Sequence, residues 1–175
     1  NKTGTKITDQ IYCNDRTAST SDAEYSTTNY TTLTSWNSTG TGYYYGAYGR
    51  IAKDNNPMLT CAVDSDRFTV NKINSKGNSA LTYPIGLITI DEVEMAGNNW
   101  SESNTSYYLH TGAYYWAGSP DVFSGGDSRE FFVGDGGFLG SYNVYSYYGV
   151  RGVVSLSSES KLLGSGTYND VYTVN

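Results

Sequence analysis

The pattern of hydrophobic and polar residues supports one helix clearly and leaves most of the chain without a sustained period. Thr89 is followed three residues later by Glu92, a spacing that forms a capping box at a helix N-terminus. Gly97 supplies the residue at which such a helix ends. We expect the acidic side chains Asp91, Glu92 and Glu94 to lie in solvent and to complement the helix dipole. The pattern therefore predicts a short helix between Thr89 and Gly97.

Short hydrophobic segments separated by turn residues predict strands through the rest of the chain. The segment 134–136 (Gly-Asp-Gly) is typical of a hairpin turn. The valine-rich segment 149–156 is predicted to be a central strand, and 168–174 a closing strand that returns to the body. Trp116 and Phe123 are expected in loops. Strands are predicted near residues 6–12, 30–36, 58–63, 67–73, 130–133, 137–142, 149–156 and 168–174.

These elements predict an α+β fold for one domain over residues 1–175, with short strands, long loops and one or two short helices. Hydrophobic residues make up 38% of the chain and aromatic residues 15%, so we expect a core built from aromatic side chains. The net charge of −6 and the scattering of the 11 Lys and Arg residues argue against nucleic-acid binding. No apolar run approaches the length of about 18 residues that a membrane span needs.

A tyrosine-rich stretch extends from Tyr107 to Gly152 and holds eight tyrosines with glycine, serine and asparagine between them. Tyrosine offers a large amphipathic contact area with few torsions to freeze, and this mixture is typical of a recognition surface. The alternative is that the tyrosines of 141–148 pack on a sheet face, since strands favour tyrosine. The segment 42–50 (GYYYGAYGR) has the same composition, and either binding or packing explains it.

The two cysteines, Cys13 and Cys61, fit no zinc pattern, because the sequence has no CxxC and a single histidine. They are either two unrelated buried thiols or a disulfide that closes a separation of 48 residues. The acidic, Ser/Thr/Asn/Tyr-rich composition is typical of exported proteins and favours the disulfide. The segment 64–66 (Asp-Ser-Asp) resembles the opening of a calcium loop, but the later ligands do not follow, so we predict a polar turn and no metal.

Catalytic signatures are weak. His110 is the only histidine, and no nucleophile motif accompanies it, so we expect a structural role. Arg129 is expected to be exposed and open to an anionic ligand, whereas Arg151 is expected to be partly buried and paired with an acid. Carboxylates for glycoside hydrolysis would have to come from turn-like segments that hold Asp121, Asp127, Glu130 and Asp135. We predict neither an enzyme nor a cofactor.

Several segments together resemble a family of exported proteins of Gram-positive-type gut bacteria and their prophages, many of which carry a prepilin-like N-terminal segment. The chain departs from many relatives at Gly152 and Val171, where they have proline. The segments that carry the resemblance are TYPIGLITIDEVEMAG (82–97), SYYLHTGAYYWAGSP (106–120), YYGVRGVVSL (147–156) and GSGTYNDVY (164–172). The C-terminal part also resembles the C-type-lectin-like fold of formylglycine-generating-enzyme type, as in the variable proteins of diversity-generating retroelements.

The resemblance implies a surface-exposed binding module whose variable segments, 121–128 and 141–148, are presented on a rigid scaffold. The partner would be a protein or glycan on another cell or on a phage or host surface. The module would act outside the cell, downstream of a targeting or anchoring segment. A pilin-like filament subunit with pilus subunits as partners is the alternative, and an extracellular glycoside hydrolase is a remote one. The predicted ligand-binding residues are Asp121, Phe123, Asp127, Ser128, Arg129, Tyr142, Asn143, Tyr145, Ser146, Tyr147 and Tyr148.

Overall fold

The computed structural model describes residues 6–17, 43–124, 127–167 and 169–174, and it has the predicted mixed character, with short strands and few helices. The strand predicted near 30–36 lies outside the described residues. In chain order the elements are β1 (Ile7–Thr8), β2 (Tyr12–Cys13), β3 (Tyr43–Tyr44), α1 (Gly46–Tyr48), the π-helix η1 (Gly49–Asp54), the 3₁₀ helix η2 (Asp64–Asp66), β4 (Arg67–Phe68), β5 (Gly86–Leu87), α2 (Ile90–Met95), β6 (Tyr115–Ser124), β7 (Asp127–Val133), β8 (Leu139–Asn143), β9 (Gly152–Val153), β10 (Ser155–Leu156), β11 (Leu162–Leu163) and β12 (Thr173–Val174).

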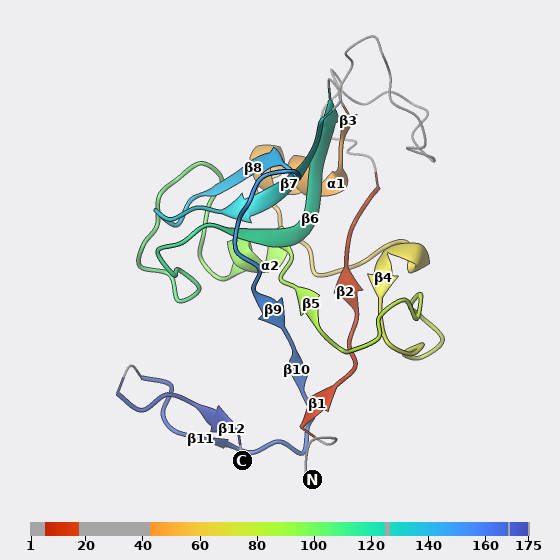
Figure 1. The fold of residues 1–175 in the computed structure, drawn as a ribbon, viewed down its shortest axis with the longest axis vertical. Coiled ribbons are helices and arrows are strands. Elements are labelled where there is room, and N and C mark those ends of the chain that lie inside the picture. Colours follow the sequence, from red (N-terminus) through yellow and green to blue (C-terminus); the bar gives the residue numbers. More distant parts are fainter. Residues whose placement is uncertain (1–5, 18–42, 125–126, 168, 175) are drawn as a thin grey trace.

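A four-stranded antiparallel sheet in the order β3-β6-β7-β8 forms the body of the molecule (Figure 1). The helical segments α1, η1 and α2 pack against one face of this sheet and enclose the core. Tyrosine and phenylalanine share this core with aliphatic residues, so it is less aromatic than the composition suggests. Its buried members are Ala47, Ile51, Ile90, Val93, Tyr107, Tyr115, Ala117, Phe131, Val133 and Leu139.

The helix α2 confirms the capping prediction. The Glu92 amide donates to Thr89 Oγ1 at 3.2 Å, and the Thr89 amide donates to Glu92 Oε2 at 2.8 Å. Gly97 follows the last helical turn with φ +105°, a left-handed conformation that glycine adopts without strain. The hairpin prediction is confirmed too, because residues 134–138 connect the paired strands β7 and β8.

The strand β6 was not predicted, because Gly118, Ser119 and Pro120 have the composition of a turn. The strand accommodates them by two register shifts against β7, one between Trp116 and Pro120 and one between Pro120 and Val122. Bulges are positions where a strand tolerates proline. The β6–β7 hairpin is therefore the longest pairing described, although only the 130–133 part of β7 was predicted as a strand and the residues of β6 were expected in loops.

Four two-stranded pairs extend from the sheet toward the two chain ends: β2-β4, β5-β9, β1-β10 and β11-β12 (Figure 1). The prediction of a central strand at 149–156 is wrong. This segment forms the short strands β9 and β10, and Val150 and Val154 are exposed. The described residues 169–174 of the predicted closing strand do not return to the body either, because β12 pairs with β11 in a hairpin. The segment 58–63, predicted as a strand, is irregular.

The predicted disulfide is present between Cys13 and Cys61, whose Cα atoms lie 5.7 Å apart. It ties β2 to the irregular segment that precedes η2. Arg67 reinforces this connection, because its Nε donates to the Cys61 carbonyl at 2.8 Å. Within the described ranges, no helix is long and apolar enough to cross a membrane.

Candidate functional site

A cluster of aromatic rings lies on the face of the sheet opposite the core. Trp116 and Phe132 are paired residues on β6 and β7, and each alternates with core residues on its strand. The ring of Tyr148 lies 4.6 Å from that of Trp116, 5.0 Å from Phe132 and 5.1 Å from Tyr114. Phe138 adds an edge contact of 5.8 Å to Phe132. We call Tyr114, Trp116, Phe132, Phe138 and Tyr148 the aromatic base.

Three tyrosines of the segment 142–147, which precedes Tyr148, are exposed to solvent. Tyr142 is 50% exposed, Tyr145 68% and Tyr147 100%. Tyr142 also touches the base, with its ring 6.2 Å from that of Tyr148. A turn shapes the segment between them, because the Ser146 amide donates to the Asn143 carbonyl at 2.9 Å. We call Tyr142, Tyr145 and Tyr147 the tyrosine surface, and the aromatic base contacts it at Tyr142.

Polar side chains predicted as ligand contacts lie beside the tyrosine surface. Arg129 is exposed, and its Nε donates to Asn143 Oδ1 at 3.2 Å. Asn143 Nδ2 in turn donates to the Tyr145 hydroxyl at 2.5 Å. The amide of Val144 donates to the Ser128 carbonyl at 3.0 Å, which holds this loop against β7. The structure therefore brings Ser128, Arg129, Asn143 and Tyr145 together.

The remaining predicted contacts are less exposed. Phe123 and Ser128 are cross-strand partners in the β6–β7 hairpin, and both are partly buried, as are Asp127 and Ser146. Tyr148 is half-buried within the aromatic base. Residues 43–50, the described part of the segment 42–50, pack on the body, since Ala47 is buried and the rings of Tyr44 and Tyr48 stack at 3.7 Å. This favours packing over binding for that segment.

Asp121 differs from the prediction, because it is 2% exposed and cannot contact a ligand from this position. It lies at the β6 bulge, next to Val122, which pairs with Arg129, and its Oδ1 has no hydrogen-bond partner. Burial raises the pKa of Asp121 to about 6, while Ser141 and the charge of Arg129 act in the opposite direction. Burial, with the Asp121 charge as a smaller cause, raises the pKa of Glu130 to about 7.

Two further sequence expectations concern His110 and Arg151. His110 Nε2 donates to the Asp135 carbonyl at 2.7 Å, which fits the structural role expected for it. Arg151 is partly buried, as expected. The prediction that it pairs with an acid is wrong. Its Nη1 donates to the Leu109 carbonyl at 2.8 Å, and its guanidinium lies 4.7 Å above the Tyr115 ring.

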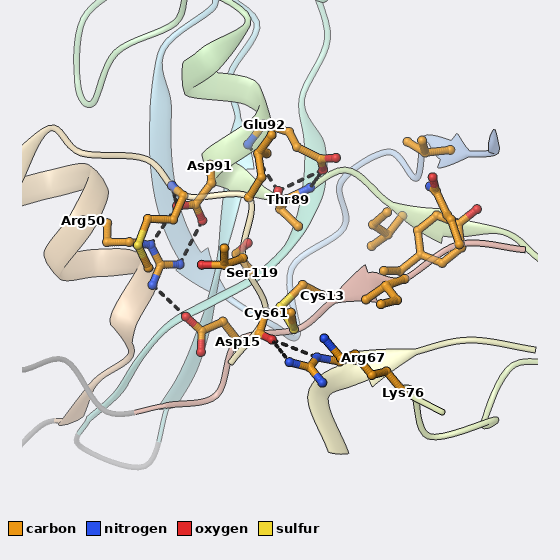
Figure 2. A pocket seen from close by; sticks show the side chains of 18 residues that line it. Cys13, Asp15, Arg50, Cys61, Arg67, Lys76, Thr89, Asp91, Glu92 and Ser119 are labelled. Carbon is orange, nitrogen blue, oxygen red and sulfur yellow. Dashed lines mark hydrogen bonds and ion pairs between the residues drawn. A yellow bond between two sulfur atoms is a disulfide. The ribbon is translucent and has the colours of Figure 1, made fainter. Parts of the chain in front are cut away.

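A cavity of about 370 Å³ lies between β2, the segment 58–61 and the start of α2 (Figure 2). Arg50 spans it, donating from Nε to Asp91 Oδ1 at 2.7 Å, from Nη2 to Asp91 Oδ2 at 3.0 Å and from Nη1 to Asp15 Oδ2 at 2.7 Å. Burial lowers the pKa of Arg50, but the bonds and charges of the two aspartates raise it above its usual value. The Met58 amide also donates to Asp91 at 2.8 Å. These ion pairs hold η1 to α2 and to the segment that follows β2, and the sequence did not predict them because their partners are distant along the chain.

Glu94 corrects the expectation of a solvated acidic turn. Its side chain is buried, with the residue 8% exposed, and neither carboxylate oxygen has a hydrogen-bond partner. Burial, with the Asp91 charge as a smaller cause, raises the pKa of Glu94 to about 7. A buried ionised carboxylate without a partner is costly, so the fold favours the protonated form.

Replacing Glu94 by glutamine should therefore make the protein more stable at alkaline pH. A carboxyl with a raised folded pKa stabilises fully below its unfolded pKa, and this contribution is lost as the pH rises through about 7. The free energy of unfolding of wild type should fall between about pH 5 and pH 8, and Glu94→Gln should remove up to roughly 3 kcal/mol of that fall. Urea unfolding at both pH values measures it. The exposed Glu159→Gln variant is the control, and an equal fall in all three proteins would contradict the assignment.

Comparison with protein-family models, curated proteins and solved structures gives no match for this chain. Among the residues that the structure describes, no group of three or more His, Cys, Asp or Glu side chains is placed to hold a metal ion. The tyrosine surface and its surroundings are therefore the features of the molecule that point to a function.

Proposed function

We propose that this chain is an extracellular ligand-binding or adhesion module with a C-type-lectin-like fold, and that it binds without catalysis. Its partner would be a protein or glycan on another cell or on a phage or host surface. The observation that carries the proposal is the tyrosine surface, where Tyr147 is fully exposed and Tyr142 and Tyr145 are at least half exposed. The disulfide fits an oxidising environment outside the cell.

Neighbouring side chains hold two of these tyrosines in place. Tyrosine combines an apolar ring with a hydroxyl, so it can bury area and form a hydrogen bond in the same contact. The aromatic base holds Tyr142 through the Tyr148 ring, and Asn143 holds the Tyr145 hydroxyl. Side chains already held in place lose less entropy when they bind, which leaves more of the contact energy for affinity. Arg129 and Asn143 add hydrogen bonding at the edge.

Replacing Tyr142, Tyr145 and Tyr147 together by alanine should abolish ligand binding without unfolding the domain. Exposed tyrosines at the centre of an interface are frequent hot spots, so binding should weaken at least about 100-fold. The melting temperature should change by no more than about 2 °C, because these side chains are mostly in solvent. A fluorescently labelled domain, applied to a glycan panel and to fixed bacterial cells, provides the measurement.

The matched control is Tyr83→Ala with Tyr172→Ala, which removes tyrosines of similar exposure (70% and 59%) from other parts of the chain. It should bind as wild type does. Equal binding by both variants would contradict the role of the tyrosine surface. A large loss of stability in the triple variant would instead show that the three tyrosines serve packing.

A structural filament subunit is the second candidate, and the β11–β12 hairpin favours it. Leu162, Leu163, Val171 and Tyr172 are each at least half exposed there. An isolated two-stranded hairpin is only marginally stable in water, so packing against another subunit would stabilise it. Sedimentation of the purified domain over a concentration series separates the two functions, because a filament subunit should associate with itself.

A further inference from the structure

Asp121, Arg129 and Asn143 belong to three neighbouring strands of the sheet, β6, β7 and β8. The β7–β8 register places Arg129 directly opposite Asn143. On the other side of β7, Val122 of β6 pairs with Arg129, and Asp121 is the unpaired residue at the register shift next to it. Asp121 is close enough for the charge of Arg129 to act on its carboxyl. Arg129 is therefore flanked by a carboxyl on one side and by a carboxamide on the other.

Of these two neighbours, Arg129 is hydrogen-bonded to Asn143. Its Nε donates to Asn143, whose Nδ2 donates to the Tyr145 hydroxyl, so the contact reaches the tyrosine surface. On the other side, Asp121 is 2% exposed and its Oδ1 has no partner. An ionised carboxylate in that position would need a cation, whereas a protonated one would not. The arrangement in the structure suits protonated Asp121.

Apart from Arg129, the groups around Asp121 supply no cation for its carboxylate. Ser141 on β8 lies within hydrogen-bonding reach, and Glu130 on β7 adds a second negative charge. The amide of Tyr45, which follows β3, donates to the Asp121 carbonyl rather than to its side chain. Of the helical segments that contact β6, α1 carries no charged residue and α2 carries the acids Asp91, Glu92 and Glu94. The cations of the neighbouring η1 are Arg50, which is held by Asp91 and Asp15, and Lys53, which lies 5.6 Å from the Tyr48 ring.

We propose that Asp121 and Asn143 compete for Arg129, so that the proton on Asp121 controls the edge of the tyrosine surface. With Asp121 protonated, Arg129 bonds to Asn143 and presents its remaining N–H groups to an anionic group on a ligand. With Asp121 ionised, Arg129 turns to Asp121, and Asn143 and Tyr145 lose the partner that orders them. The ligand part of this inference rests on the proposed function and specifies it: the ligand carries a carboxylate or sulfate and binds more tightly in acid.

The test is a pH titration of the isotope-labelled domain from about pH 5 to pH 8, followed by NMR of the Arg129 Nε–H and the Asn143 side-chain amide. Both signals should shift with one midpoint near the Asp121 pKa of about 6. In Asp121→Asn both should stay at their acid positions. Glu94→Gln is the matched control, because it removes another buried carboxyl, one on α2, and should leave both transitions unchanged.

A second variant guards against a folding defect in Asp121→Asn. In Arg129→Gln the Asn143 amide should no longer respond to pH, since the side chain that transmits the change is gone. A wild-type titration in which neither Arg129 nor Asn143 shifts would overturn the proposal, and so would a transition that persists in Asp121→Asn.

Sodium sulfate at constant ionic strength serves as the probe for the anion. It should shift the Arg129 Nε–H signal more strongly at acid than at alkaline pH in wild type, and equally at both in Asp121→Asn. An equal response to sulfate at both pH values in wild type would overturn the inference that an anionic ligand binds more tightly in acid. These readouts need no natural ligand, so they can fail or succeed independently of the binding test on the three tyrosines.

Discussion

Replacing Arg50 by methionine should lower the free energy of unfolding by about 3–5 kcal/mol, the range found when one partner of a buried ion pair is removed. Methionine fills similar space but leaves two acids without their cation. The side chains of Asp91 and Asp15 are 4% and 12% exposed, so solvent cannot replace the lost contacts. Urea unfolding near neutral pH measures the change.

Two further variants make this test specific. Lys76→Met alters an exposed lysine at the same cavity and should change stability by no more than about 0.5 kcal/mol. Combining Arg50→Met with Asp91→Asn should cost less than the sum of the two single changes, because no charge then stays unpaired at that contact. A loss below about 1 kcal/mol for Arg50→Met would show that the ion pairs do not hold η1 to α2 and to the segment that follows β2.

Replacing both Cys13 and Cys61 by alanine should lower the free energy of unfolding by about 4 kcal/mol, as expected from loop entropy for a crosslink over 48 residues. The native contacts around the disulfide keep their partners, so the effect arises mainly in the unfolded chain. Thermal unfolding measures it, with wild type in reductant as the parallel sample. Equal melting temperatures for oxidised and reduced wild type would contradict this expectation.

Local signals in the sequence predicted local structure well. The capping box at Thr89 and Glu92 and the Gly-Asp-Gly turn before β8 each need only a few neighbouring residues, and both are present. The disulfide could be predicted because two cysteines allow a single pairing. The α+β class followed from the same short elements.

The sequence did not predict the strands whose form depends on pairing with distant segments. The strand β6 includes Pro120, and only its bulge against β7 makes that proline compatible with a strand. Segment 149–156 is rich in valine, but the strands with which it pairs, β5 and β1, are each two residues long. Val150 and Val154 therefore stay exposed. For the site, composition located the exposed tyrosines but could not show that Asp121 points inward, because strand alternation shifts at a bulge.

The two ends of the described chain also decide how the module can be oriented. Strands β1 and β12 lie together at one end of the molecule, and the four-stranded sheet lies at the other (Figure 1). A tether attached at either end would therefore hold the sheet away from the anchoring surface. When a ligand on the sheet is pulled, the load would pass along the narrow two-stranded pairs, where Cys13 and Cys61 provide a covalent bond that hydrogen bonds alone could not match under tension.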